Sequence, residues 1–172
     1  MVSNTQSKVT TVQVRAAEGI DLPQKATEGS LAYDLRCAEA FVLPPNTTKL
    51  VGTGLYLTFP AGIAPLVLPR SGKSYKERLC VANAPGLIDT DYEGELKVVA
   101  ENRGQQKLKF EAGEAIAQLL FVPVVETELK TPAEAAVVTE PAEPAKPTKP
   151  TAPIAPRGTG GFGSTDRGGS NG

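Results

Sequence analysis

The stretch KLVGTGLYLTFPAGIAPLVLP, residues 49–69, joins two runs of β-forming residues through a Pro-Ala-Gly turn signal. Similar runs recur at residues 9–14, 96–102 and 116–125, and clusters of Gly, Pro, Asn or Asp separate them. No long segment shows the 3.6-residue apolar period of an amphipathic helix. Several short strands at this spacing predict an all-β sandwich or barrel. We expect one short helix near residues 74–79.

The composition excludes several classes of function. The 172 residues are 40% hydrophobic, which is enough for a core, and the formal net charge is −1. A near-neutral chain lacks the basic surface that nucleic-acid binding requires. No apolar run reaches the roughly 18 residues of a membrane span, and the polar start MVSNTQSKVTTVQV has no signal-peptide apolar block. We therefore expect a cytoplasmic protein, or a nuclear one in a eukaryote, with no nucleic-acid or membrane partner.

The sequence contains no histidine and only two cysteines, Cys37 and Cys80. Catalysis by Ser-His-Asp or Cys-His groups is therefore excluded, as are the common zinc sites. A base acting near neutral pH has to be a carboxylate, a lysine or a water molecule. Any catalytic metal is expected to have oxygen ligands and to resemble magnesium. We interpret the two cysteines as buried small apolar residues and not as a disulfide framework.

The composition changes after Val125. We predict a globular domain over residues 1–125, a Pro/Ala-rich spacer over residues 126–156 and a Gly-rich arm over residues 157–172. Every third residue from 141 to 156 is proline, which places the prolines on one ridge of a polyproline II helix. The spacer is either a stiff linker or a docking ligand for a proline-binding partner. Fully extended, this proline segment would reach about 50 Å.

The arm combines an aromatic ring, a cation and hydroxyl groups among its glycines. Such groups clamp a base and phosphates in other proteins, although Gly-rich termini are usually only disordered. The residues concerned are Arg157, Phe162, Ser164 and Thr165.

Two glycine patterns resemble nucleotide-binding motifs and are rejected. Gly158, Gly160 and Gly163 match G-x-G-x-x-G, but no strand precedes them and no helical pattern follows. Gly72 begins a Gly-Lys-Ser sequence, but Val67 occupies the position where a P-loop has its first glycine.

Four clusters in the globular part carry groups suited to phosphate or metal chemistry. Asp34 lies between apolar neighbours in LAYDLRCAE (31–39), where an ordinary turn aspartate is the alternative. LPRSGKS (68–74) offers a guanidinium, a hydroxyl and backbone N–H groups to a phosphate, or is simply a turn before a helix. NAPGLIDTDYEGELKV (83–98) contains four carboxylates around one tyrosine. Its pattern predicts a strand, a Gly-containing turn and a second strand. The alternative is a solvated acidic hairpin with no role in binding. In the fourth cluster, Gln118 is a polar residue within an apolar strand. The alternative is an ordinary strand residue that faces outward.

Together the clusters and the arm resemble the five motifs of the trimeric all-β dUTP pyrophosphatases (dUTPases), in the same order. The matching segments are LAYDL, PRSGKS, GLIDTDYEGE, GEAIAQL and RGTGGFGSTD. The resemblance covers about residues 8–125 and 157–166. It implies a distorted jelly-roll or β-clip barrel with one short helix and an extended C-terminal arm. It also implies hydrolysis of dUTP to dUMP and pyrophosphate, which keeps uracil out of DNA and supplies dUMP for thymidylate synthesis.

The resemblance assigns the reacting end of the substrate to a few residues. Asp89 is implied to orient and activate the water that attacks the α-phosphorus, and to hold the sugar 3′-hydroxyl. Asp34 is implied to contact the water shell of a Mg²⁺ ion that the triphosphate itself holds. Phosphate oxygens are implied to bind Arg70, Ser71, Gly72 and Gln118.

The nucleoside end is assigned in the same way. Tyr92 is implied to lie under the deoxyribose and to leave no room for a 2′-hydroxyl. The uracil edge is implied to pair with the segment that contains Asn83, Gly86 and Ile88.

The resemblance implies a homotrimer in which the arm of one subunit closes over the site of a neighbouring subunit. The uracil is implied to stack on Phe162. The β- and γ-phosphates are implied to meet Arg157, Gly163, Ser164 and Thr165.

The sequence departs from the family motifs at several positions. Leu31-Ala32 replaces Ala-Gly, and Asp166 replaces the last glycine of the fifth motif. Lys73 stands where an apolar or small residue is common; it either adds attraction for phosphate or faces solvent.

Two other functions stay open on this scaffold. A dCTP deaminase shares the fold, although Asp91-Tyr92 favours dUTP hydrolysis over the Gly-Trp usual in deaminases. The second alternative is a regulatory protein that uses this scaffold to bind a partner.

Overall fold

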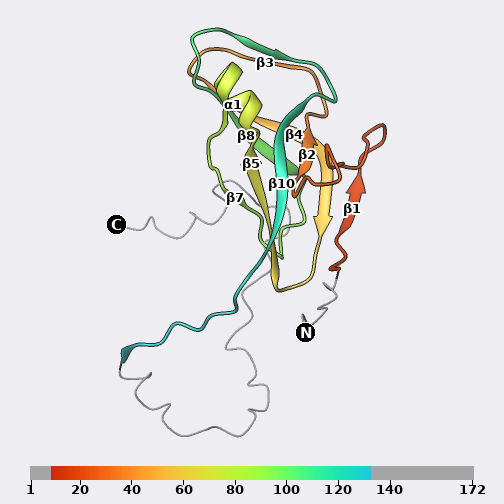
Figure 1. The fold of residues 1–172 in the computed structure, drawn as a ribbon, viewed down its shortest axis with the longest axis vertical. Coiled ribbons are helices and arrows are strands. Elements are labelled where there is room, and N and C mark those ends of the chain that lie inside the picture. Colours follow the sequence, from red (N-terminus) through yellow and green to blue (C-terminus); the bar gives the residue numbers. More distant parts are fainter. Residues whose placement is uncertain (1–8, 133–172) are drawn as a thin grey trace, which may run out of the picture.

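The computed structural model describes residues 9–132 and consists of short strands with one helix (Figure 1). The elements in chain order are β1 (Gln13–Ala16), β2 (Tyr33–Arg36), β3 (Phe41–Leu43), β4 (Thr48–Thr58), β5 (Ile63–Pro69), α1 (Ser71–Glu77), β6 (Leu79–Val81), β7 (Gly86–Leu87), β8 (Leu96–Asn102), β9 (Leu108–Phe110) and β10 (Ala115–Pro123). The prediction of an all-β fold with one short helix is confirmed.

The strands form three antiparallel sheets and no closed barrel among the described residues. One four-stranded sheet has the order β1-β4-β8-β6, a second has the order β2-β10-β5-β7, and β3 pairs with β9. Every strand pair in these sheets is antiparallel. The long strands β4, β5 and β10 dominate the body, and α1 lies at the same end as β3 (Figure 1).

Alternation of buried and exposed side chains decides which face of each sheet meets the core. In β8, Leu96, Val98 and Ala100 are buried while the residues between them are half-buried. This period of two is the signature of a strand with one face against the core. Side chains from both large sheets form a single cluster, to which Leu35 and Leu119 contribute from the second sheet.

A bulge in β4 shapes the connection that precedes β8. The pairing of β4 with β8 shifts register between Gly52 and Leu55, and Gly54 adopts a φ of 68°, which favours glycine. The Glu95 carboxylate accepts a hydrogen bond of 2.8 Å from the Gly54 N–H, and the buried Thr53 hydroxyl donates to the carbonyl of Leu96. The bulge therefore fixes the start of β8.

The structure corrects several predicted boundaries. The helix occupies Ser71–Glu77 and not residues 74–79, because it begins directly after β5 with Arg70 as its N-cap. The first strand begins at Gln13 and not at residue 9. Asp34 lies in strand β2 and not in a turn.

Residues 83–98 do not form a simple two-stranded hairpin. Strand β8 pairs with β6 and β4, whereas β7 pairs with β5 in the other sheet. The connection between β6 and β8 thus crosses to the second sheet and returns. Neighbours distant in sequence decide this pairing, so the strand–turn–strand pattern was not sufficient to predict it.

Other expectations concern cysteines, membranes and the C-terminal segments. Cys37 is buried, Cys80 is half-buried, and both are free thiols. Within residues 9–132 we find no helix with the length and hydropathy of a membrane span. Most of the predicted spacer (126–156) and all of the arm (157–172) lie outside the described residues.

Candidate active site

A pocket of about 590 Å³ lies over the junction of β2, β10, β5 and α1. Adjacent strands of the second sheet place the relevant side chains side by side, because Gln118 on β10 pairs with Asp34 on one side and with Leu68 on the other. Paired residues of neighbouring strands share a face of the sheet. The first, second and fourth motifs contribute eight residues to the pocket lining: Leu31, Ala32, Asp34, Arg70, Ser71, Gly72, Lys73 and Gln118.

Arg70 links the elements around this pocket. Its Nε lies 3.1 Å from Oδ1 of Asp34, and its Nη1 donates a hydrogen bond of 3.0 Å to the carbonyl of Ala115. About a third of the Arg70 side chain is exposed, and 17% of that of Asp34. The guanidinium is therefore held in place but still accessible from the pocket.

Ser71 and Gly72 are exposed at the start of α1. The first i to i−4 hydrogen bond of the helix runs from the Ser74 N–H to the Arg70 carbonyl. The N–H groups before Ser74 have no acceptor within the helix, as at every helix start. A hydroxyl and backbone donors thus stand beside the Arg70 guanidinium.

Gln118 has a structural contact as well as a place in the pocket. Its side-chain Nε2 donates a hydrogen bond of 2.9 Å to the carbonyl of Pro69, the last residue of β5. Gln118 lies between the buried core residues Ala117 and Leu119, so its half-buried side chain faces away from the core and into the pocket, which agrees with an outward-facing strand residue. The contact holds the residue before Arg70 against β10.

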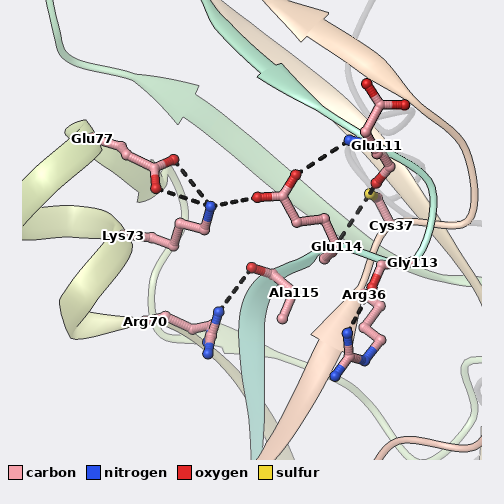
Figure 2. Close-up of polar contacts among 9 residues, drawn as sticks. All are labelled: Arg36, Cys37, Arg70, Lys73, Glu77, Glu111, Gly113, Glu114 and Ala115. Carbon is pink, nitrogen blue, oxygen red and sulfur yellow. Dashed lines mark hydrogen bonds and ion pairs between the residues drawn. The ribbon is translucent and has the colours of Figure 1, made fainter.

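Lys73 does not face solvent. Its ammonium lies 2.6 Å from Oε1 of Glu114 and 2.9 Å from Oε1 of Glu77 (Figure 2). The ammonium also lies over the ring of Phe110. Burial alone would lower the pKa of Lys73, but its hydrogen bonds with Glu114 and Glu77 outweigh this effect and the pKa is raised. The hydrogen bond from Lys73 lowers the pKa of Glu114. Both groups are therefore charged near neutral pH.

The third-motif residues lie on the connection between β6 and β8. Asn83 is exposed in the turn, whereas Gly86 is buried in β7 and pairs with Val67. Ile88 is half-buried and its N–H bonds to the carbonyl of Pro65. A Cβ added to Gly86 would lie 3.2 Å from the Asn83 amide and 3.3 Å from Val67. The absence of a side chain at Gly86 therefore lets this turn close against β5.

Asp89 and Tyr92 are joined by a tight turn in the same connection. The Tyr92 N–H donates a hydrogen bond of 3.2 Å to the carbonyl of Asp89, and both residues are half-buried. The Tyr92 hydroxyl donates a hydrogen bond of 2.9 Å to the carbonyl of Glu95. Burial is the main cause that raises the pKa of Tyr92, so the phenol stays protonated. Its ring lies against Gly94, where an added Cβ would come within 2.6 Å of Cζ.

One chain does not bring all the predicted residues into one pocket. The residues that line the pocket at Arg70 include none from 83–92. The predicted arm residues Arg157, Phe162, Gly163, Ser164 and Thr165 lie outside the described part of the chain.

A comparison with protein-family models matches residues 18–165 to the dUTPase model. The chain belongs to the dUTPase family. The match spans most of the chain and reaches into the arm, so it includes four motif segments in full and all but the last residue of the fifth.

Two dUTPase relatives and one solved structure illustrate the similarity. The chain is 44% identical over 122 residues to a deoxyuridine 5′-triphosphate nucleotidohydrolase of Alcanivorax borkumensis, covering 69% of this chain and 81% of the relative. It is 39% identical over 158 residues to that of Brucella melitensis, covering 90% of each. The structure resembles a dUTPase from phage phi11 of S. aureus with a TM-score of 0.66 and 26% identity, covering 71% of this chain and 96% of that one.

The described residues offer few side chains grouped as metal ligands. Within residues 9–132, no three carboxylate or thiol side chains are grouped so that they alone could hold a metal ion. The phage phi11 dUTPase coordinates a structural Mg(II) ion. In the pocket described here, the Asp34 carboxylate is an oxygen donor of the type that magnesium prefers.

Sequence reasoning missed two contributors to this dUTPase site. Glu114 was not predicted to matter, although its place in the fourth motif, four residues before Gln118, was a signal. Glu95 was counted only as one of several acidic residues, whereas it holds the β4 bulge and accepts the Tyr92 hydroxyl through its carbonyl.

Proposed function

We propose that this chain hydrolyses dUTP to dUMP and pyrophosphate through attack of a water molecule, activated by Asp89, on the α-phosphorus. The observation that carries the proposal is the pocket in which three motifs of this dUTPase-family chain meet. Its carboxylate, guanidinium, hydroxyl and amide come from Asp34, Arg70, Ser71 and Gln118.

The triphosphate binds at the Arg70 end of this pocket. A guanidinium presents several N–H donors in a fixed plane and suits phosphate oxygens. The Arg70 guanidinium is held by Asp34 and by the carbonyl of Ala115, which reduces the conformational freedom lost when it binds an anion. The exposed Ser71 hydroxyl and the Gly72 N–H add donors at the start of α1, and Gln118 contributes its amide.

Asp34 would contact the water shell of a Mg²⁺ ion that accompanies the triphosphate. Such an ion, when bound, fixes the geometry of the triphosphate and offsets negative charge as pyrophosphate leaves. Asp34 is suited to this task because its carboxylate borders the pocket and stays partly exposed there, although Arg70 offsets part of its charge.

The nucleoside binds to the connection between β6 and β8. Uracil offers O4 as an acceptor and N3–H as a donor, whereas cytosine reverses both, so fixed groups between Asn83 and Ile88 discriminate between them. Close packing around Gly86 excludes the thymine methyl group. Tyr92 lies under the deoxyribose and excludes a 2′-hydroxyl, which rejects UTP.

Asp89 performs the proton transfer. Its carboxylate accepts a proton from the attacking water as the water oxygen bonds to the α-phosphorus. The bond from the α-phosphorus to the bridging oxygen breaks, and pyrophosphate leaves with that oxygen. A positioned group of this kind contributes roughly 10²–10⁴ in rate. In a chain without histidine, a carboxylate is a suitable base.

A homotrimer would complete the site. The pocket at Arg70 and the segment 83–92 do not share a lining in one chain, so we propose that different subunits supply them and that the arm (157–172) closes over a neighbour's site. Leu31 is 81% exposed, Leu87 60% and Val125 81%, and we propose these apolar side chains as candidates for burial between subunits. The spacer carries the arm between subunits; whether it also binds a partner is a separate hypothesis.

One experiment tests the reaction against its alternatives. The purified chain is incubated with Mg²⁺ and each of dUTP, dCTP, dTTP and UTP, and the release of pyrophosphate and of ammonia is measured. We expect pyrophosphate from dUTP alone and no ammonia. Ammonia from dCTP would identify a deaminase, and no release from any nucleotide would favour a regulatory binding protein.

A further inference from the structure

The turn between β9 and β10 is attached to the end of β2 by backbone and side-chain hydrogen bonds (Figure 2). Cys37 donates its N–H to the carbonyl of Glu114 and its thiol to the carbonyl of Glu111, and its own carbonyl accepts the Gly113 N–H. Arg36 Nη1 donates to the carbonyl of Gly113 at 2.7 Å. The turn therefore has a fixed position relative to β2, the strand that carries Asp34.

The same turn is attached to α1 through two parallel links. Lys73 reaches Glu114 at 2.6 Å, and one residue further along the chain Arg70 reaches the carbonyl of Ala115 at 3.0 Å. Figure 2 shows both links running from α1 and its N-cap to the start of β10. The second carboxylate oxygen of Glu114 accepts the Glu111 N–H at 3.2 Å, so the carboxylate is held on both sides.

Lys73 borders the same pocket, but its charge is already engaged by two carboxylates. Its side chain is 16% exposed, and two carboxylates surround its one positive charge. The group of Lys73, Glu77 and Glu114 therefore carries one net negative charge, which does not attract a triphosphate. If Lys73 moved to bind a phosphate, it would lose its ion pairs with Glu77 and Glu114.

We propose that Glu114 is a positioning residue, which through Lys73 holds the start of α1 and the start of β10 at the separation that phosphate binding requires. The inference rests on the proposed function, because it assigns the triphosphate to the pocket formed by Arg70, Ser71 and Gln118. Lys73 acts through Glu114 and does not contact phosphate.

The alternative role of Lys73, direct attraction of phosphate, predicts an effect of opposite sign. Glu114→Gln would then release Lys73 and remove a repelling charge, so substrate would bind more tightly. Under the positioning role, Glu114→Gln and Lys73→Met both loosen the same link and both weaken binding. The double variant is then no worse than the worse single one, because the two residues act as a unit.

The test measures kcat and KM for dUTP in Glu114→Gln, Lys73→Met, the double variant and Lys73→Arg. We expect KM to rise about 3- to 10-fold in both single variants, corresponding to about 0.7–1.4 kcal/mol, while kcat changes less than about twofold. Lys73→Arg keeps the positive charge and should therefore avoid most of this rise in KM. The matched controls are Glu111→Gln, on the same turn, and Lys109→Met, an exposed lysine of β9; both should leave KM unchanged.

A second readout separates this inference from the proposed reaction. Calorimetry measures the binding of inorganic tripolyphosphate to the same folded variants, checked by thermal melting. Glu114→Asp, which keeps the charge but shortens its reach, serves if Glu114→Gln does not fold. Tighter binding by Glu114→Gln, or unchanged binding in both single variants, would overturn the positioning role. A wild-type chain that binds tripolyphosphate but leaves dUTP intact would overturn the reaction alone.

Discussion

The guanidinium Nε of Arg70 lies 3.1 Å from Oδ1 of Asp34, so the proposed phosphate ligand is paired with the residue proposed to meet the metal's water shell. The two residues come from different elements, the N-cap of α1 and strand β2. Asp34 thus balances the charge of Arg70 before a polyanion arrives. Both side chains remain partly exposed in the pocket, so both are available to a magnesium triphosphate.

Replacement of Asp34 by Asn should affect magnesium more than nucleotide. The amide removes a negative charge beside the ion, so we expect the Mg²⁺ concentration for half-maximal turnover to rise several-fold. At saturating Mg²⁺, KM for dUTP should change little, since Arg70 keeps its bond to Ala115. A magnesium titration of turnover measures this, with Asp21→Asn as an exposed-carboxylate control. An unaltered magnesium titration would contradict the role of Asp34.

Gly94 should control sugar discrimination through Tyr92. A Cβ at position 94 would lie 2.5 Å from the Tyr92 hydroxyl oxygen, so Gly94→Ala has to displace the ring. We expect the preference for dUTP over UTP, as a ratio of kcat/KM, to fall by about 10-fold or more, the size of effect that a change in pocket packing produces. Gly29→Ala is the matched control, because nothing lies within 4 Å of its added Cβ. Retained discrimination in Gly94→Ala would argue against Tyr92 as the selector.

The Lys73–Glu114 pair should stabilise the fold in a defined pH window. Lys73 lowers the pKa of Glu114 below its usual value of about 4.5, with a smaller contribution from Arg70, while Glu77 shares Lys73. A carboxylate with a lowered folded-state pKa stabilises the fold above the unfolded-state pKa and loses this effect as the pH falls. The raised pKa of Lys73 keeps the ammonium charged throughout the neutral range.

Urea unfolding of wild type and Glu114→Gln at several pH values measures this contribution. The difference in free energy of unfolding should be constant between about pH 5.5 and 8 and should shrink as the pH falls below about 4.5. A difference that persists undiminished at pH 3 would show that the ion pair is not its source.

Asn102 should be required for stability and not for chemistry. Its side chain is fully buried; Nδ2 donates to the carbonyls of Leu43 and Gln106, and Oδ1 accepts the Gly104 N–H. Asn102→Ala leaves these groups without their partner, and each buried polar group left unsatisfied costs about 1–3 kcal/mol. We expect roughly 2–4 kcal/mol of destabilisation in urea unfolding, against almost none for the exposed Gln105→Ala. A loss below about 0.5 kcal/mol would contradict this account.

The strands that could be predicted from the sequence are those whose own pattern of apolar residues shows which face is buried. The strands β4, β5, β8 and β10 are 7 to 11 residues long, and their apolar patterns extend far enough to be recognised. Strands of two to four residues, such as β7 and β9, carry too little pattern. The partner strand decides where they pair, as the attachment of β7 to β5 illustrates.

The motifs pointed to Asp34, Arg70 and Gln118, and these three residues line one pocket. The roles that the motifs imply for them stay predictions. The role of Lys73 was not predictable, because it depends on Glu114, which lies 41 residues away in sequence. The same limit applies to Glu95, whose partner Gly54 belongs to a distant strand.

The central claim, that Asp89 activates the attacking water, is tested most directly by Asp89→Asn. The change keeps the shape of the side chain and removes its capacity to accept a proton. We predict that binding of the non-hydrolysable analogue dUpNHpp stays within about threefold of wild type, while kcat for pyrophosphate release from dUTP falls about 10²- to 10⁴-fold. Turnover close to that of wild type in a folded Asp89→Asn protein would contradict the account.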